Sequence, residues 1–308
     1  MSRLPFLADV APESPALMDD GSSAWVSYCD MSSMAHRWAE RLQGPRCLVF
    51  IYARNDVETV CAFLGAIAAG HVVALFDADL PTCARIGLES TYSPAWVVGP
   101  ESGEVSVRRQ PSSQQLNPLL AVLLSTSGST GSAKLVRLSL SALETNAAGI
   151  AEVLEIRETD VAMGHLPLHY SYGLSVLTSH LSVGASVRLT DMGVTDRGFW
   201  AEMRGNQVTH MPGVPFHYQV MLKLGLKRLS IPSVRTLTQA GGALAPDLRS
   251  QVYDFAESCG AQFFILYGQT EAAPRMTTLR HAEFSKAPAS VGHPLPGCRI
   301  EVDMPDER

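Results

Sequence analysis

From residue 46 onward, short apolar runs alternate with longer stretches whose apolar residues recur at helical spacing. RCLVFIYA (46–53) and HVVALFDA (71–78) are short and apolar, which is typical of buried strands. Between them, Asp56 is expected to cap the helix VETVCAFLGAIAAG, which stops at Gly70. Because strands that alternate with helices form parallel sheets with helices on both faces, this pattern predicts an α/β fold.

The alternation continues along the chain, and 308 residues suit two packed sheets better than one very wide sheet. Ser141 and Glu144 have the spacing of a capping box. The polar segment 99–117 is predicted to be a loop-rich break, and RIEVDMPDER (299–308) to be a strand followed by an acidic tail. Further strands are expected near 95–99, 119–126, 185–190, 207–210, 234–238 and 261–266, and further helices are expected to begin near Ser141, Tyr172, Thr195, Val214 and Ala245.

Composition narrows the classes of function. Hydrophobic residues make up 46% of the chain and charged residues 18%, which is typical of a globular protein rather than a disordered one. The formal net charge of -6 offers no general attraction for nucleic acid or for an anionic membrane, and no apolar run is long enough to span a membrane. The six cysteines form no C-x-x-C pair, and the N-terminus lacks the features of a signal peptide. We therefore expect a cytoplasmic protein with free thiols.

A segment rich in glycine and hydroxyl side chains follows LLAVLLST (119–126), the most apolar strand candidate. In TSGSTGSAK (126–134) the glycines allow backbone N–H groups to converge, the hydroxyls add donors and Lys134 adds a charge, as a polyphosphate cradle requires. A Walker A motif differs, because four residues separate its glycines and its Lys precedes Ser or Thr. Composition alone leaves open a flexible Ser/Gly loop with a solvated Lys134.

This segment resembles the phosphate loop of the adenylate-forming superfamily, which comprises acyl- and aryl-CoA synthetases, adenylation domains of peptide synthetases, and luciferases. The family's usual Pro before the Lys is Ala133 here. Further segments are similar to the same family in the same order along the chain: AWVSYCDMSSMAHRWAERL (24–42), FLGAIAAGHVVALFDADLP (63–81), LPLHYSYGLSV (166–176), LTQAGGALAPDL (237–248), ILYGQTEAAPRM (265–276) and SVGHPLPGCRIEV (290–302). The resemblance implies that residues 1–308 are the N-terminal large domain of such an enzyme. That domain has two packed, doubly wound, mostly parallel sheets covered by helices, forming two α/β subdomains, with a partial barrel strand near 290–302.

The resemblance also implies roles in the attack of a carboxylate on the α-phosphate of ATP. Tyr267 would stack on adenine, Thr270 would hydrogen-bond the α-phosphate, and Glu271 would hold the Mg²⁺ that bridges the phosphates. Thr270, Glu271 and Lys134 are the candidate catalytic residues. The other nucleotide-binding candidates are Thr126, Ser127, Gly128, Ser129, Thr130, Gly131, Gly241, Gly242, Ala243 and Gly268. Taken without the resemblance, Tyr267 could be a core aromatic and Glu271 a solvated carboxylate.

The acyl pocket is expected to be lined partly from LPLHYSYGLSV (166–176). His169 and Tyr170 reverse the family's usual order of an aromatic residue followed by His, so either side chain could border the carboxylate. His169 could equally be a packed, hydrogen-bonded residue. Adenylation domains for α-amino acids usually place an Asp in this segment, and none is present here, so a fatty, aryl or other simple organic acid is expected. The pocket candidates are His169, Tyr170, Tyr172, Gly173, Val214 and Phe216.

The family's Thr-Gly-Asp segment and its C-terminal lid, with the lid Lys, have no counterpart in these residues. We therefore expect the N-terminal part of a longer ligase that activates a carboxylic acid as acyl-AMP, using ATP and Mg²⁺. Such a ligase then forms a thioester with CoA or with the phosphopantetheine arm of an acyl carrier protein, and the chain alone is expected to be weakly active or inactive. The alternative is a non-catalytic homologue that binds a nucleotide or acyl ligand. A dehydrogenase is excluded because no G-x-G-x-x-G follows an early strand.

Overall fold

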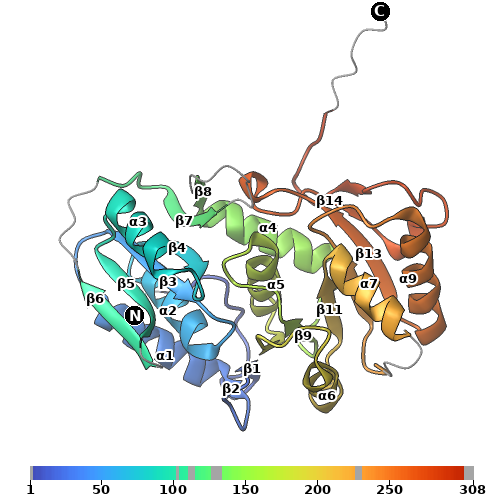
Figure 1. Cartoon of the computed structure of the whole chain (residues 1–308), viewed down its shortest axis with the longest axis horizontal. Coiled ribbons are helices and arrows are strands. Elements are labelled where there is room, and N and C mark those ends of the chain that lie inside the picture. The colour runs from blue at the N-terminus through green and yellow to red at the C-terminus, as the bar shows by residue number, and fades with distance from the viewer. Residues whose placement is uncertain (1–2, 102–103, 110–114, 126–133, 226–230, 302–308) are drawn as a thin grey trace, which may run out of the picture.

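The protein's structure, a computed structural model, describes residues 3–101, 104–109, 115–125, 134–225 and 231–301. Its strands form two sheets that lie beside each other, with helices packed on them (Figure 1). The first sheet has the order β6-β5-β3-β4-β7-β8, in which the four central strands run parallel and β6 and β8 are antiparallel edges. Its strands are β3 (Leu48–Ala53), β4 (Val72–Asp77), β5 (Trp96–Glu101), β6 (Glu104–Arg109), β7 (Leu120–Ser125) and β8 (Leu135–Ser139).

The second sheet is larger and has the order β15-β14-β13-β12-β11-β9-β10-β1-β2. The strands from β13 to β1 run parallel, and antiparallel strands extend both edges. Its strands are β1 (Pro15–Met18), β2 (Val26–Ser27), β9 (Val161–Gly164), β10 (Ser186–Leu189), β11 (His210–Gly213), β12 (Thr236–Gln239), β13 (Gln262–Tyr267), β14 (Thr277–Leu279) and β15 (His293–Pro294). The prediction of two packed, mostly parallel α/β sheets is therefore confirmed.

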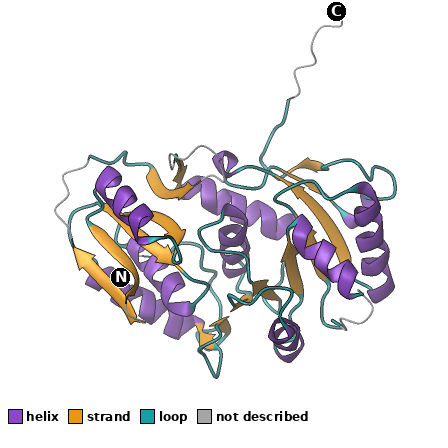
Figure 2. Cartoon of the chain, in the orientation of Figure 1, coloured by secondary structure: helices purple, strands orange, loops and turns teal. Residues whose placement is uncertain are grey.

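Helices cover both faces of each sheet, as Figure 2 shows. On the first sheet, α1 (Tyr28–Arg41) and α2 (Val57–Ala68) pack together on one face, and α3 (Thr82–Tyr92) covers the other. On the second, α4 (Leu140–Val153) and α5 (Ser171–Leu181) lie on the face toward the first sheet. The outer face carries α6 (Arg197–Gly205), α7 (Pro215–Leu224) and α9 (Pro246–Cys259), and two 3₁₀ turns follow, η1 (Thr270–Ala272) and η2 (His281–Glu283).

Successive residues of the central strands point to different cores, because side chains alternate across a strand. In β3, Val49 and Ile51 belong to the core between the sheets, whereas Leu48 and Phe50 pack beneath α3. Both faces of such a strand need apolar residues, which is why LVFIYA reads as a continuous apolar run.

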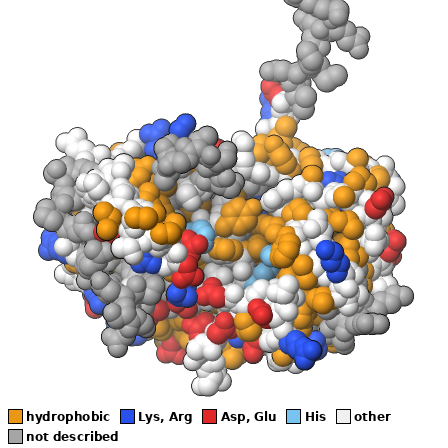
Figure 3. Space-filling view, viewed as in Figure 1, with side chains coloured by type: hydrophobic (Ala, Val, Ile, Leu, Met, Phe, Trp, Pro, Cys, Tyr) orange, Lys and Arg blue, Asp and Glu red, His pale blue; other side chains and the backbone are white. Residues whose placement is uncertain are grey.

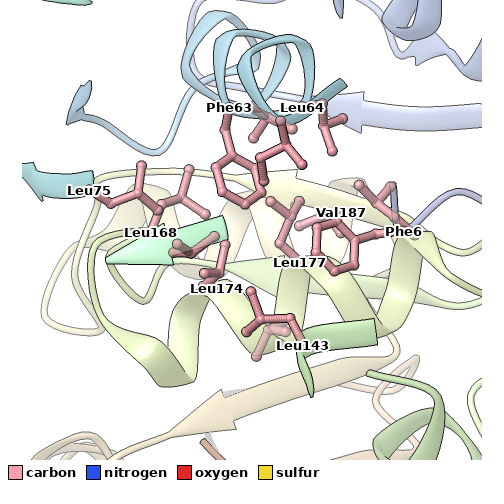
Figure 4. Packing of buried hydrophobic residues seen from close by; sticks show 14 of the residues in the cluster. Phe6, Phe63, Leu64, Leu75, Leu143, Leu168, Leu174, Leu177 and Val187 are labelled. Carbon is pink, nitrogen blue, oxygen red and sulfur yellow. The ribbon is translucent and has the colours of Figure 1, made fainter. Parts of the chain in front are cut away.

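One hydrophobic core joins the two sheets. Phe63 of α2 and Leu177 of α5 both belong to it, and Figure 4 shows their side chains together with Leu75, Leu168 and Val187. Burial of each such side chain contributes about 1.5–3 kcal/mol. The two sheets therefore form one packed body.

The first strand of the chain lies far along the second sheet. Leu17 of β1 pairs in parallel register with Val187 of β10, and the Ser186 hydroxyl donates to the Pro15 carbonyl at 2.7 Å. The earliest residues of the chain thus complete a sheet that is otherwise made from its second half.

Local signals were predicted with mixed success. Asp56 caps α2, since its side chain accepts from the Thr59 N–H at 2.7 Å. The capping box at Ser141 is wrong, because Ser139 is the N-cap of α4 and accepts from the Ala142 N–H at 3.1 Å. Composition predicts the start of a helix only to within a residue or two. Here β8 ends at Ser139 and α4 begins at the next residue, so Ser139 and not Ser141 is at the N-cap position.

Two segments differ from the predicted loop and strand. The predicted break at 99–117 contains the whole of β6, which forms an antiparallel pair with β5, so about a third of this segment is an edge strand. The strand predicted from 299 is not formed through residue 301, and residues 302–308 lie outside the described part of the chain. Residues 299–301 are exposed and pair with no strand of the described ranges. Whether a segment forms a strand depends on whether a neighbouring strand pairs with it, and its own residues do not show this. This explains both differences between the prediction and the structure.

Candidate active site

A cavity of about 610 Å³ opens where β12 and β13 end. The carboxyl ends of parallel strands are the usual place for a ligand in an open α/β sheet, because the loops that follow them diverge there. Its lining comes from the start of α5, the loop after β12 and the turn after β13. The lining residues are Tyr170, Ser171, Tyr172, Gln239, Ala240, Gly241, Gly242, Ala243, Arg249, Ile265, Leu266, Tyr267, Gly268, Gln269, Thr270, Glu271, Pro274, Arg275 and Val291.

The loop after β12 forms one wall of the cavity, and a side chain at the end of β12 holds it in place. The Gln239 side chain donates from Nε2 to the Gly242 carbonyl at 2.7 Å. Gly241 has φ +76°, and a Cβ there would lie 2.5 Å from the Tyr170 hydroxyl oxygen. Only glycine fits this backbone beside Tyr170, so the wall brings main chain directly against the cavity.

The turn after β13 forms a second wall. Tyr267 is 49% exposed, so its ring offers a surface to a ligand rather than filling the core. A Cβ on Gly268 would lie 1.8 Å from the Pro274 carbonyl oxygen, which shows how tightly the chain folds back. The Thr270 hydroxyl lies 3.0 Å from the Ser171 hydroxyl at the start of α5. This contact links the turn after β13 to the start of α5.

The first turn of α5 supplies an aromatic wall. The Tyr172 hydroxyl donates to the Thr238 carbonyl at 3.0 Å and lies 2.8 Å from the Thr238 hydroxyl. Burial raises the pKa of Tyr172 and also that of Tyr170, so both phenols are neutral near pH 7. Their rings meet edge to face, with centroids 6.3 Å apart.

Arg275 lies within the wall and is only 4% exposed. Its Nε donates to the Ser175 hydroxyl at 3.2 Å, and its guanidinium carbon lies 4.9 Å from the centre of the Tyr172 ring. The Asn146 side chain of α4 donates to the Arg275 carbonyl at 2.7 Å. Burial lowers the pKa of Arg275 to about 10, which leaves the side chain charged at neutral pH.

The predicted phosphate loop lies outside the described residues. Its members Thr126, Ser127, Gly128, Ser129, Thr130 and Gly131 therefore remain predictions. Lys134 is exposed and directly precedes β8, and β8 contacts η1, where Thr270 and Glu271 lie. The fold thus brings the strand that follows Lys134 to the turn that carries the other two catalytic candidates.

Four of the predicted pocket residues lie outside the cavity lining. Burial lowers the pKa of His169, although the charges of Asp77 and Asp191 act in the opposite direction. The Nδ1 atom of His169 has no hydrogen-bond partner among the described residues. Figure 3 shows acidic side chains gathered near the middle of the face that it displays. A Cβ on Gly173 would lie 2.3 Å from the Pro167 carbonyl, so this glycine lets α5 pack closely on the preceding loop.

The other two come from the start of α7. Val214 is the N-cap of α7, and its Cγ1 would be 3.1 Å from a Cβ at Gly241, so it lies behind the wall. Phe216 is 58% exposed. Of the predicted acyl-pocket residues, Tyr170 and Tyr172 are the ones that line the cavity.

Comparison with known proteins decides the family. A family model described as AMP-binding enzyme matches residues 84–308, which is most of the chain. The chain belongs to the AMP-binding enzyme family. The predicted membership of the adenylate-forming superfamily is therefore confirmed, and the relatives of this AMP-binding chain are CoA ligases and adenylation-domain synthetases.

Two curated relatives and one solved structure illustrate the similarity. Oxalate–CoA ligase of Arabidopsis thaliana is 31% identical over 180 residues, a match that covers 57% of this chain and 34% of that protein. Phenyloxazoline synthase MbtB of Mycobacterium tuberculosis is 29% identical over 331 residues, covering 97% of this chain and 23% of that protein. The matched part of the chain thus corresponds to about a third of the length of the first relative and about a quarter of the second. The o-succinylbenzoate CoA synthetase MenE of Bacillus subtilis, in complex with its acyl-adenylate intermediate, has the same fold, with a TM-score of 0.80 and 21% identity. That match covers 98% of this chain and 66% of MenE.

The family's use of ATP and Mg²⁺ can be tested against the residues of this AMP-binding chain. Glu271 is an exposed carboxylate on the cavity wall. In the described ranges no three His, Cys, Asp or Glu side chains converge on one point. A single carboxylate fits Mg²⁺, which keeps several waters and is otherwise held by phosphate oxygens.

In the same described ranges no helix is long and apolar enough to cross a membrane.

Several lining residues were not predicted from the sequence. Ser171, Gln239, Arg249 and Arg275 line the cavity, and all lie inside or beside the segments that carry the family resemblance. The available signal was polarity: Gln239 and Arg275 stand in otherwise small or apolar stretches, where a polar residue that becomes buried needs a specific partner.

Proposed function

We propose that this chain is the acid-activating part of a ligase that converts a carboxylic acid other than an α-amino acid into its acyl-AMP. The complete enzyme would then transfer the acyl group to CoA or to a carrier-protein thiol. One observation carries the proposal: a single cavity brings Tyr267, Thr270 and Glu271 together with the glycine loop after β12 and with the first turn of α5.

The chemistry of each lining residue suits a different role in the proposed reaction. The exposed face of Tyr267 suits an adenine ring, and the Gly241–Gly242 main chain allows a nucleotide close approach. The Thr270 hydroxyl, fixed by Ser171, would donate to the α-phosphate while a carboxylate oxygen attacks phosphorus and pyrophosphate leaves. Mg²⁺ held by Glu271 would neutralise phosphate charge during this displacement.

The charges on the cavity wall favour an acid without an ammonium group. The charged residues of the described lining are Arg249, Arg275 and Glu271, of which two are cationic. Glu271 is assigned to the metal, so no described carboxylate of the lining remains to hold an α-amino group. All six cysteines are free thiols, which favours the reducing cytoplasm as the compartment.

Ligand-induced thermal stabilisation tests the proposal. Mg·ATP and non-hydrolysable acyl-adenylate mimics at about 100 times their dissociation constants should each stabilise the fold by about 2.7 kcal/mol. Tyr267→Ala should remove most of the stabilisation. Tyr253→Ala is the matched control, because Tyr253 stacks on Phe284 away from the cavity.

The outcomes separate the candidate functions. Stabilisation by none of these ligands would contradict the proposal. Stabilisation by mimic and Mg·ATP, without ATP–pyrophosphate exchange when the complete protein is assayed, would identify a non-catalytic binder instead.

A further inference from the structure

Arg275 is a buried cation on the cavity wall with no anionic partner in the described part of the chain. It is 4% exposed, and its Nη1 is buried without any hydrogen-bond partner there. Its described contacts are the Ser175 hydroxyl and the face of the Tyr172 ring. A buried charge without a counter-charge is strongly unfavourable, so an Arg in this state requires an explanation.

The surrounding titratable groups do not supply the missing charge. Burial raises the pKa of Tyr172, which keeps that phenol neutral. His180 and His210 both have pKa values lowered chiefly by burial and further by the charge of Arg275, so they are neutral as well. Asp160, the buried carboxylate of this region, is already bound by Arg235. The counter-charge of Arg275 is therefore expected from a ligand.

The position of Arg275 relative to Thr270 indicates which ligand. Ser171 contacts Thr270, and Ser175 contacts Arg275. These two serines are one turn apart on α5, which corresponds to about 6 Å along the helix axis. The carboxylate that is activated beside Thr270 thus lies about one helical turn from the guanidinium.

We propose that Arg275 binds a second carboxylate of the substrate, so that the acid activated by this protein is a dicarboxylic acid of about four to six carbons. This inference rests on the proposed function, because it names the substrate class of the same cavity. A guanidinium and a carboxylate can form two parallel hydrogen bonds. Glu271 is the one carboxylate among the described lining residues, so no other carboxylate of the lining competes with the substrate for Arg275. A monocarboxylic acid of equal length would leave the buried charge unpaired.

Matched acyl-adenylate mimics test this assignment by calorimetry. Sulfamoyl-adenosines carrying succinyl, glutaryl or adipoyl groups are compared with those carrying butanoyl, pentanoyl or hexanoyl groups. The wild-type chain should bind the best dicarboxylic mimic about 10- to 100-fold more tightly than its monocarboxylic counterpart, the range expected for a charge-assisted hydrogen bond. This comparison needs no variant, so it stands even if a substitution at Arg275 prevents folding.

Two substitutions then assign the preference to one side chain. Arg275→Met should reduce the ratio of the two affinities to about one, and Arg275→Lys should leave an intermediate ratio because the charge remains while the paired hydrogen bonds are lost. Arg280→Met is the control, since Arg280 is exposed and does not line the cavity, and it should keep the full ratio.

Each contrary outcome has a distinct meaning. Equal affinity of the wild-type chain for both kinds of mimic, or a preference that survives Arg275→Met, would overturn the dicarboxylate assignment while the proposed function stands. If Arg275→Met weakens Mg·ATP as much as the dicarboxylic mimic, the anion is a phosphate of the nucleotide and the assignment is also overturned. Failure of every mimic and of Mg·ATP to bind would instead overturn the proposed function itself.

Discussion

Gly241→Ala is expected to destabilise the protein through the cavity wall and not through backbone strain alone. An L-residue at φ +76° costs about 1–2 kcal/mol. The new Cβ would also lie 2.5 Å from the Tyr170 hydroxyl oxygen, so the Tyr170 ring must leave its preferred rotamer at about 0.5–1.5 kcal/mol. The total loss in the free energy of unfolding should be about 1.5–3.5 kcal/mol.

Gly260→Ala isolates the backbone part of this effect. Gly260 has φ +71° at the end of α9, and nothing lies within 4 Å of a Cβ there, so the loss should be about 1–2 kcal/mol. Urea unfolding monitored by circular dichroism would measure both variants. In a Tyr170→Phe background the phenol oxygen is absent, and Gly241→Ala should then cost nearly the same as Gly260→Ala. Equal destabilisation by the two variants in the wild-type background would refute the contact between Gly241 and Tyr170 as the cause.

Three further results are expected. Arg235→Met should lower the free energy of unfolding by about 3–5 kcal/mol, because it removes the guanidinium that pairs with Asp160, a carboxylate that is 2% exposed. Arg54→Met, at an exposed ion pair, should cost less than about 1 kcal/mol in the same urea titration, and similar losses would contradict the argument. Burial lowers the pKa of His217 to about 4, so the unfolded chain, with a His pKa near 6.5, binds more protons, and stability should fall as the pH is lowered from about 7 to about 4. His217→Phe should flatten this fall in urea titrations at stepped pH, and an unchanged slope would exclude His217 as a source. Glu271→Gln should raise the Mg²⁺ concentration needed for thermal stabilisation by ATP, and an unchanged Mg²⁺ dependence would remove Glu271 from the metal site.

Most of the fold could be predicted because its central strands are buried on both faces. The strand expected at 261–266 is β13, Gln262–Tyr267, and the strand expected at 71–78 is β4, Val72–Asp77. Edge strands were harder to predict from the sequence than central strands. The β6 strand carries Glu104 and Arg109, and nothing in its polar composition distinguishes an antiparallel edge from a loop.

The candidate site was predictable where a short motif carries it and not where packing creates it. Thr270 and Glu271 were predicted as site residues from the YGQTE segment, and both line the cavity. The position of Phe216 after β11 does not reveal its direction, and the structure exposes it. The sequence marks Arg275 only as a polar residue in an otherwise small or apolar stretch. Its burial could not be predicted, because it arises where α4, α5 and the turn after β13 meet around one side chain.

The pairing of β1 with β10 has a consequence for how the chain is made. Ser186 and Pro15, which hydrogen-bond across these strands, are 171 residues apart in sequence. During synthesis the first strand must wait for more than half of the chain before its parallel neighbour exists, and such non-local pairing slows folding and prolongs the exposure of apolar segments. Until then Ala16 and Leu17, both fully buried in the finished protein, have no sheet to join. The apolar residues of β1 are therefore expected to stay exposed on the newly made chain until β10 has been synthesised.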